Sequence, residues 1–327
     1  MNKSIITTRV RLARNLKSHP FVGRMNNEQK NEVKAIIKNA LISIIPDFEF
    51  YDMSSLNPLQ SMAFMESHLI SPQFAKERNG NGLLINSDKT VSIMINEEDH
   101  LRIQYIDFSE CSDIAYDNTK KISDLFDEKL ALAFDDKLGF LTSCPTNLGT
   151  GMRVSYMMHL PILTELGHIK NIQSFAAKFG FTIRGMYGEG SDSVSGIYQL
   201  SNQISMGISE ADTISRLNEI ALKIHGNEKH ARDIFVKANN LMFEDKIYRN
   251  LGILEKAKLL SYNEFLKCYS AVREGIEAGA INLNLKEFDR LLFSTGPNNL
   301  ADGSSMTDSL QRDAKRAQIT NKFIANN

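Results

Sequence analysis

The sequence lacks an excess of charge of either sign, because 38 lysines and arginines stand against 39 aspartates and glutamates, for a formal net charge of −1. This balance argues against charge-driven binding to nucleic acid or to anionic lipid. No apolar run approaches the roughly 20 residues that a membrane span needs. Residues 1–15 carry arginines and no apolar core of a signal peptide. We therefore expect a cytoplasmic protein without direct contact with membranes or nucleic acid.

Cysteine and the common nucleotide motifs are also scarce. Cys111, Cys144 and Cys268 form no spaced pair, so neither a disulfide framework nor a cysteine metal site is expected. No GxxxxGK[ST] loop occurs, and HRD, DFG and a VAIK-type lysine motif are missing as well. A nucleotide bound by this chain must therefore be held by other groups.

The pattern of apolar residues predicts strands and helices in alternation, followed by helices alone. Along Thr7–Leu12, alternation places Thr7, Arg9 and Arg11 on one strand face. Residues 83–106 are typical of a hairpin with SDKT as its turn, and 182–207 of two strands joined by a Gly/Ser-rich loop. Helices are predicted over 27–45, 113–135, 154–180, the segment beyond 209, and 310–324. This pattern indicates a mixed, mainly antiparallel sheet flanked by helices, and then a helical region.

Arginines occur where an anion could use them. A strand face seldom exposes a pair such as Arg9 and Arg11 without one, although a solvated edge is the simpler interpretation of that pair alone. Arg102, Arg153 and Arg184 lie in or beside further motifs, which favours a polyphosphate cradle. Phosphoryl transfer needs such charge neutralisation and positioning more than covalent help.

The stretch LTSCPTNLGTGMR (141–153) combines a cysteine, a tight glycine-containing loop and an arginine. Together with NEEDHLR (96–102) and TTRVRLARN (7–15), it resembles the phosphagen (guanidino) kinase family, and in particular its bacterial branch, the protein arginine kinases. The resemblance runs from about Ile5 to about Leu254. It implies an α+β fold with a glutamine-synthetase-like catalytic core over residues 1–231 and a helical domain over 232–327.

The same resemblance implies ATP, with Mg²⁺ bound through the nucleotide, and a set of nucleotide contacts. These are Thr7, Thr8, Arg9, Val10, Arg11, His68, Arg102, Arg153, Val154, Ser155, Tyr156, Met157, Arg184, Gly185, Met186, Tyr187, Gly188 and Glu189. Taken alone, His68 is more often a structural residue than a ligand. No metal site formed by the protein itself is expected.

The catalytic residues implied by the family motifs are Glu98, Cys144 and Asp192. Glu97 and Glu98 are predicted to alternate across a strand, so that one of them faces the site, and the motif gives that role to Glu98. Its carboxylate would orient a guanidinium and help to remove its proton. Cys144 is implied as a neighbour of the guanidinium. Asp192 stands where the small-guanidine kinases have a glutamate, so Glu189 is an alternative second carboxylate.

Near the end, RDAKRA (312–317) places Arg312 and Arg316 one helical turn apart, with Asp313 adjacent. A basic amphipathic helix is the simpler interpretation. The string also matches the R-D-x-x-R-A signature of protein arginine kinases, which implies a regulatory phosphoarginine pocket formed by Arg312, Asp313, Arg316 and Ala317.

The resemblance implies a kinase for arginine side chains in proteins, acting in regulation or degradation under stress. Implied partners are arginine-containing substrates such as a transcriptional repressor, a zinc-binding activator, a Clp-type protease system and a second copy of the chain. The alternatives are a kinase for free arginine or another small guanidine, and a weakly catalytic phosphoarginine-binding regulator. Kinases of small guanidines carry an additional helical domain before the motifs, and we expect this chain to lack it.

Overall fold

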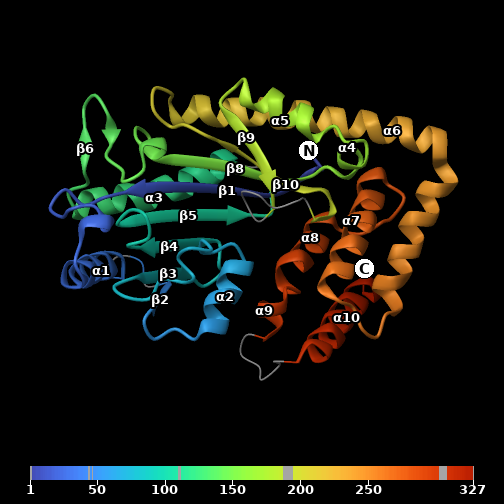
Figure 1. Cartoon of the computed structure of the whole chain (residues 1–327), viewed down its shortest axis with the longest axis horizontal. Coiled ribbons are helices and arrows are strands. Elements are labelled where there is room, and N and C mark those ends of the chain that lie inside the picture. Colours follow the sequence, from blue (N-terminus) through green and yellow to red (C-terminus); the bar gives the residue numbers. More distant parts are fainter. Residues whose placement is uncertain are drawn as a thin grey trace.

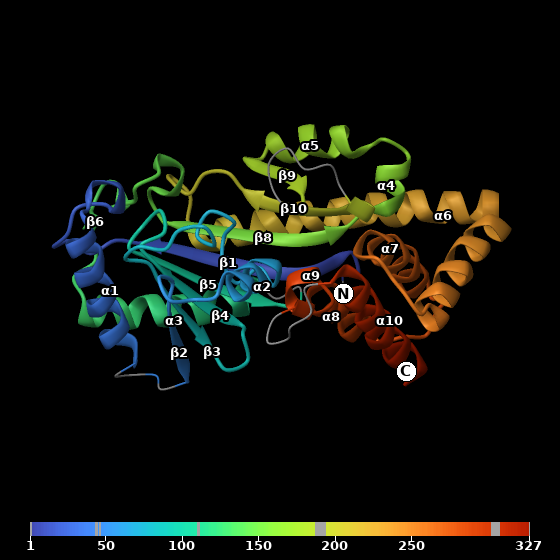
Figure 2. The ribbon, with the colours of Figure 1, turned by 60° about the horizontal axis from the view of Figure 1, so that its bottom comes forward.

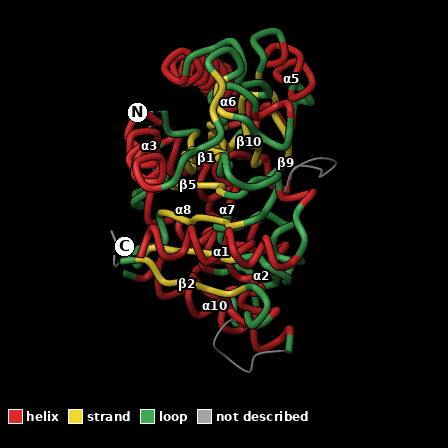
Figure 3. The backbone as a smooth tube through the Cα atoms, turned by 90° about the vertical axis from the view of Figure 1, so that its left-hand side faces the viewer, coloured by secondary structure: helices red, strands yellow, loops and turns green. Residues whose placement is uncertain are grey.

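An eight-stranded sheet forms the centre of the molecule (Figure 1). The computed structural model describes residues 2–42, 45, 47–109, 112–186, 194–301 and 308–326. The strand order is β2-β3-β4-β5-β1-β8-β10-β9, and each neighbouring pair is antiparallel. The strands are β1 (Ile5–Arg14), β2 (Phe48–Asp52), β3 (Gly82–Asn86), β4 (Val91–Ile95), β5 (Leu101–Asp107), β8 (Met152–His159), β9 (Phe181–Gly185) and β10 (Ile197–Asn202), with a separate hairpin of β6 (Phe134–Asp135) and β7 (Gly139–Phe140). Figure 3 shows β10, β1, β5 and β2 following one another across the sheet.

Helices flank the sheet and make up most of the C-terminal region. They are α1 (Asn27–Ile42), α2 (Pro58–Glu66), α3 (Ser112–Lys129), α4 (Pro161–Glu165), α5 (Ile169–Ala177), α6 (Glu210–Lys256), α7 (Tyr262–Ala278), α8 (Leu285–Ser294), α9 (Pro297–Ala301) and α10 (Ser309–Ala325), with the short 3-10 turns η1 (Val22–Arg24), η2 (Pro145–Asn147) and η3 (Val194–Gly196). In the part of the chain that the structure describes, no helix is both long and apolar enough to cross a membrane. The predicted α+β architecture is confirmed.

The two faces of the sheet are covered differently, because successive side chains of a strand point to opposite faces. On one face, Val10 and Leu12 of β1 pack in a core with α3, α5 and α6. On the other face, α2 packs over β3 and β4, and the C-terminal helices pack against Ile6 and Ile197 at the far end. Between these two groups of helices, this second face carries the polar residues of the site.

The structure corrects two predicted helices. Residues 154–159, the first part of the predicted helix 154–180, belong to the strand β8, and helix begins only at Pro161. Nearly every side chain of β8 is buried, so the segment lacks the polar/apolar alternation by which an exposed strand is recognised. The helix predicted over 113–135 ends at Lys129. The predicted hairpin 83–106 has its SDKT turn but continues into a third strand.

The predicted domain boundary at residues 231 and 232 falls inside α6. This helix is broken only at Asn239, where φ is −140° and ψ is 41°. Figures 1 and 2 show α6 running along the sheet and then turning down beside α7 and α10. The sheet and the C-terminal helices therefore share one long element.

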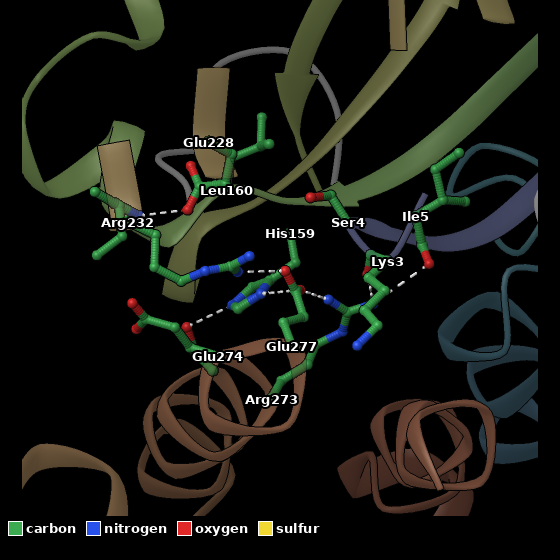
Figure 4. A network of polar contacts seen from close by, with 12 residues as sticks. Lys3, Ser4, Ile5, His159, Leu160, Glu228, Arg232, Arg273, Glu274 and Glu277 are labelled. Carbon is green, nitrogen blue, oxygen red and sulfur yellow. Dashed lines mark hydrogen bonds and ion pairs between the residues drawn. The ribbon is translucent and has the colours of Figure 1, made fainter. Parts of the chain in front are cut away.

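A buried polar network joins the C-terminal helices to two strands (Figure 4). Arg273 of α7 donates to the carbonyls of Lys3 and Ile5, at 3.1 and 3.3 Å, around the start of β1. His159, at the end of β8, lies 3.2 Å from Glu277 and 2.8 Å from Ser270, both on α7. These contacts fix α7 against β1, which carries Arg9 and Arg11, and against the end of β8, the strand that carries Arg153.

Candidate active site

A cavity of about 420 Å³ opens on the polar face of the sheet. Five arginines line it, contributed by four strands: Arg9, Arg11, Arg102, Arg153 and Arg184. The other lining residues are Met65, His68, Ile70, Ser71, Pro72, Met94, Gln104, Met186, Gln199 and Ser201. The cavity thus combines a cationic floor with apolar walls, as a ligand with a charged and a flat apolar part requires.

Strand register brings the arginines together. Arg11 of β1 lies opposite Arg153 of β8 and opposite Gln104 of β5. Because β-strand side chains alternate, Arg9 and Arg11 share this face, while Val10 points into the core behind it. The predicted shared face of Thr7–Leu12 is therefore confirmed.

Arg9 and Arg11 have no carboxylate partner among the described residues. The buried Nε of Arg11 also lacks a hydrogen-bond acceptor there. Burial, followed by the charges of Arg102 and Arg153, lowers the pKa of Arg9 to about 9. Burial and the neighbouring arginines also lower the pKa of Arg11 well below its usual range. A bound polyanion would supply the missing acceptors and relieve this repulsion.

Arg102 differs because it forms an ion pair with Glu97, with 2.5 Å between Nη1 and Oε2. Burial alone would raise the pKa of Glu97, but Arg102 and hydrogen bonds from Ser71 and the Glu98 backbone hold it below its usual value. The prediction that Glu97 and Glu98 alternate on a strand is wrong. Both lie in the connection between β4 and β5, which begins at Asn96 with a φ of 60°.

The Glu98 side chain contacts a second group of residues. Its Oε2 accepts a 3.3 Å hydrogen bond from the Asn147 side chain. Burial, with Asp99 and Glu97, raises the pKa of Glu98, while the charge of Arg102 and then the nearby Cys144 partly oppose that rise. The structure therefore brings together the two catalytic residues Glu98 and Cys144 that the family motifs imply.

Asp99 ties the loops of Glu98 and Cys144 together. It is buried, and its Oδ1 accepts hydrogen bonds from the Ser143 backbone at 2.7 Å and from Asn15 at 2.6 Å. His100 is also buried; its Nδ1 accepts from the Leu16 backbone at 2.9 Å. The two residues after Glu98 thus anchor its loop to the end of β1.

Some predicted nucleotide contacts turn their side chains elsewhere. Val10, Val154 and Tyr156 pack in the core on the opposite face, and Met157 packs with the C-terminal helices. Thr8 donates to the carbonyl of Ser109. Thr7 on β1, Ser155 on β8 and Gly185 on the edge strand β9 do not line the cavity. At these eight positions, a bound nucleotide would meet neighbouring side chains or the backbone.

Tyr187, Gly188, Glu189 and Asp192 lie outside the described residues. The choice between Asp192 and Glu189 as second carboxylate stays a prediction. Among the described residues, no cluster of three or more histidines, cysteines, aspartates or glutamates could hold a metal ion.

RDAKRA lies on α10, away from the cavity. Arg316 is 1% exposed. It donates to the carbonyls of Thr295 and Leu260, at 2.8 and 2.7 Å, and pairs with Asp313 at 2.6 Å. Arg312 and Asp313 are half-buried. The Arg316 guanidinium thus holds α10 to its neighbours, and the role of these residues in a phosphoarginine pocket stays a prediction.

Several residues around the site escaped prediction. Gln104 is two residues after Arg102 on β5 and could have been found from strand alternation. Gln199, Ser201 and the segment 70–72 carry no motif, and only the fold brings them to the cavity. The partnership of Glu97 with Arg102 was missed because the loop between β4 and β5 was taken for strand.

Comparisons with known proteins agree with this geometry. Residues 29–231 match the family described as ATP:guanido phosphotransferase, C-terminal catalytic domain. Residues 240–326 match the family described as Protein-arginine kinase McsB C-terminal domain.

Among curated relatives, a protein named Protein-arginine kinase from Caldanaerobacter subterraneus subsp. tengcongensis is 41% identical over 319 residues, which cover 96% of this chain and 95% of the relative. One of the same name from Clostridium acetobutylicum is 40% identical, covering 90% and 88%. Among solved structures, a lombricine kinase shares the fold, with a TM-score of 0.64 and 22% identity over 71% of this chain and 68% of its own. The duplicated taurocyamine kinase from Schistosoma mansoni has a TM-score of 0.62 and 25% identity, covering 80% of this chain and 38% of its own.

Proposed function

Since the chain belongs to the ATP:guanido phosphotransferase family, we propose that it is an ATP-dependent protein-arginine kinase, which transfers the γ-phosphoryl group of ATP to the guanidinium of arginine side chains in proteins. The observation that carries this proposal is the five-arginine cavity, in which Arg9 and Arg11 have no carboxylate partner among the described residues. Free arginine or another small guanidine is the alternative substrate.

Different cavity residues would bind different parts of ATP. Arg9, Arg11 and Arg153 offer guanidinium donors to the phosphate oxygens, and they neutralise charge as the γ-phosphoryl group leaves. The apolar side chains of Ile70 and Met186 offer a surface for the base. Mg²⁺ would be carried on the nucleotide oxygens and would add to the charge neutralisation there. This division of the cavity fits one elongated anion with an apolar end.

Glu98 and Cys144 form the acceptor side. A guanidinium is a poor nucleophile because its pKa exceeds about 12. The carboxylate of Glu98 can orient it through paired hydrogen bonds and accept its proton as the N–P bond forms. The raised pKa of Glu98 makes it the stronger base for this step. Cys144, which lies near Glu98 and whose thiol hydrogen-bonds with the Thr146 hydroxyl, would contact the same guanidinium.

Support for a protein substrate comes from the C-terminal region. Residues 240–326 match the C-terminal domain of protein-arginine kinases. The two curated relatives of that name align with this chain over 95% and 88% of their own length. We propose further that Arg312 and Asp313, with Ala317 beside them, form a regulatory phosphoarginine site, with Arg316 as its internal support. A weakly catalytic regulator that uses this site alone is a second alternative.

The cellular setting is part of the proposal. Marked proteins would be regulated or degraded under stress in the cytoplasm. The proposed partners are substrates such as a transcriptional repressor, a zinc-binding activator, a Clp-type protease system and a second copy of this chain. Family membership is the support for each of these.

The test offers labelled ATP with free arginine and, separately, with an unfolded basic protein. Transfer to the protein and little or none to free arginine is the expected result. Preferential labelling of free arginine would establish the small-guanidine kinase instead. Binding of a phosphoarginine peptide without transfer to either acceptor would favour the regulator.

A further inference from the structure

His68 reaches the cavity from a tight turn directly after α2. Its φ is 57°, a left-handed conformation that residues other than glycine seldom adopt. Its backbone N–H donates to the Met65 carbonyl at 3.0 Å, and its own carbonyl accepts from Gln104 at 2.7 Å. The position of the imidazole in the cavity therefore depends on what holds the two residues before it.

Those two residues are held by α9, from the C-terminal region. The Glu66 carboxylate accepts from the backbone N–H of Asn298, at 3.0 and 2.8 Å to its two oxygens. It also accepts from the Asn299 backbone at 2.8 Å and from the Asn298 side chain at 2.6 Å. Ser67 adds a 3.1 Å hydrogen bond to the Asn299 side chain. The Glu66 carboxylate thus accepts hydrogen bonds from N–H groups in the first turn of α9, which have no acceptor within the helix. Glu66 and Asn298 are 232 residues apart in the sequence.

The surroundings are shaped for this contact. A Cβ on Gly296 would overlap Oε2 of Glu66, so a larger residue there would force the carboxylate to shift from its present position. The Phe293 ring packs against the His68 ring, with centroids 5.4 Å apart. Figures 1 and 2 both show α9 beside α2. The residues from 293 to 299 therefore contact the turn of His68 through its side chain and through the two residues before it.

We infer that Glu66 is a positioning residue, through which the C-terminal helices set the place of His68 in the nucleotide cavity. This inference rests on the proposed function, because it assumes that His68 contacts bound ATP. A general anchor for α2 could act at any residue of that helix. Contacts at the last residue of α2 and at Ser67 instead fix the turn itself, and they make nucleotide affinity depend on the C-terminal region.

The connection continues to α10. Thr295, between Phe293 and Asn298, gives its carbonyl to Arg316. A shift of α10 would therefore displace α9 and, through Glu66, the turn that holds His68. This continuous set of contacts offers a physical route by which occupancy near Asp313 could change affinity for ATP.

The test is a double-mutant cycle on the full-length chain, with equilibrium binding of ATP as the readout. Wild type, Glu66→Ala, His68→Ala and the double variant are compared, and the thermal midpoint of each is recorded. We expect Glu66→Ala to weaken ATP binding about tenfold, or about 1.4 kcal/mol. In the His68→Ala background, the same change should have little effect, because its effect passes through His68. Gly296→Ala, which displaces the carboxylate without removing it, should weaken binding in the same way.

Glu66→Gln keeps one acceptor oxygen and should recover part of the affinity; it also replaces Glu66→Ala in the cycle if that variant does not fold. Equal losses of ATP affinity in the wild-type and His68→Ala backgrounds would overturn the inference, because they would make Glu66 a stabilising contact only. Unchanged affinity in the Glu66 variants would overturn it as well. Failure of the wild type itself to bind ATP would contradict the proposed function and is recognised separately.

Discussion

At the scale of single residues, the cavity arginines are of two kinds. Arg11 has no carboxylate partner in the described part of the chain, whereas Arg102 is paired with the buried Glu97. We predict that Arg11→Met raises the free energy of unfolding by about 1–2 kcal/mol, because it removes an uncompensated cation. Arg102→Met should lower it by about 1–3 kcal/mol, because Glu97 is left without its partner. Both should weaken ATP binding.

Urea unfolding and ATP titration of the same two variants measure these effects. Arg78→Met is a control outside the cavity, since Arg78 donates to the carbonyls of Met53 and Leu56 and its loss should leave ATP affinity unchanged. Destabilisation by Arg11→Met as large as that by Arg102→Met would contradict the distinction between the two arginines.

The buried His68 makes the free energy of unfolding depend on pH. Burial, followed by Arg9, lowers its pKa to about 3, against about 6.5 in an unfolded chain. Above pH 6.5 the imidazole is neutral in both states. Between pH 6.5 and about 3, the imidazole of His68 is protonated only in the unfolded chain. The free energy of unfolding therefore decreases as the pH is lowered, by up to about 1.4 kcal/mol per pH unit.

We therefore predict that His68→Gln makes the free energy of unfolding less dependent on pH between 5 and 6.5, by roughly this slope. Urea unfolding at several pH values measures it, with His168→Gln at an exposed position as the control. Equal slopes for wild type and His68→Gln would show that His68 takes up a proton in the folded protein.

At the scale of elements, alternation on β1 was enough to predict the arginine face. It failed for β8, since strands covered on both faces carry apolar residues throughout, and a run such as VSYMMHL then suits a buried helix equally well. The motifs predicted that Glu98 and Cys144 would meet. They could not predict that Asp99 and Asn15 join their loops, because such contacts depend on the registration of distant segments.

On α10, Arg316 supports the fold, whereas Arg312 and Asp313 are the proposed contacts for phosphoarginine. Arg316 satisfies the carbonyls of Thr295 and Leu260. Arg316→Ala would leave both acceptors and Asp313 without their donor. We predict a loss of about 2–4 kcal/mol in the free energy of unfolding, while Lys315→Ala, at an exposed position one residue earlier, changes it by less than about 0.5 kcal/mol. Chemical denaturation tests both. A loss of phosphoarginine binding in Arg316→Ala without loss of stability would instead assign Arg316 directly to the ligand.

At the scale of the whole molecule, the polar network of α7 holds the sheet and the C-terminal helices together. The fully buried Arg273 contacts the backbone on either side of Ser4 and the carboxylates of Glu277 and Asp289. We predict that Arg273→Met removes one of the two arginines that pair with Glu277 and leaves Asp289 with the Tyr269 hydroxyl as its donor, and that the single unfolding transition of the wild type separates into two. Calorimetry of the full chain tests this. One transition at an unchanged midpoint would show that burial of apolar surface alone joins the two regions.

The central claim is that this chain forms an N–P bond on arginine side chains with Glu98 as the base. The most direct measurement is phosphorus NMR of an unfolded basic protein after incubation with the enzyme and ATP. We predict a phosphoramidate signal that disappears in acid and survives alkali, and that Glu98→Gln reduces its rate of formation by about 10²–10⁴-fold while ATP binding is retained. Acid-stable phosphate on hydroxyl groups, or an undiminished rate with Glu98→Gln, would contradict the claim.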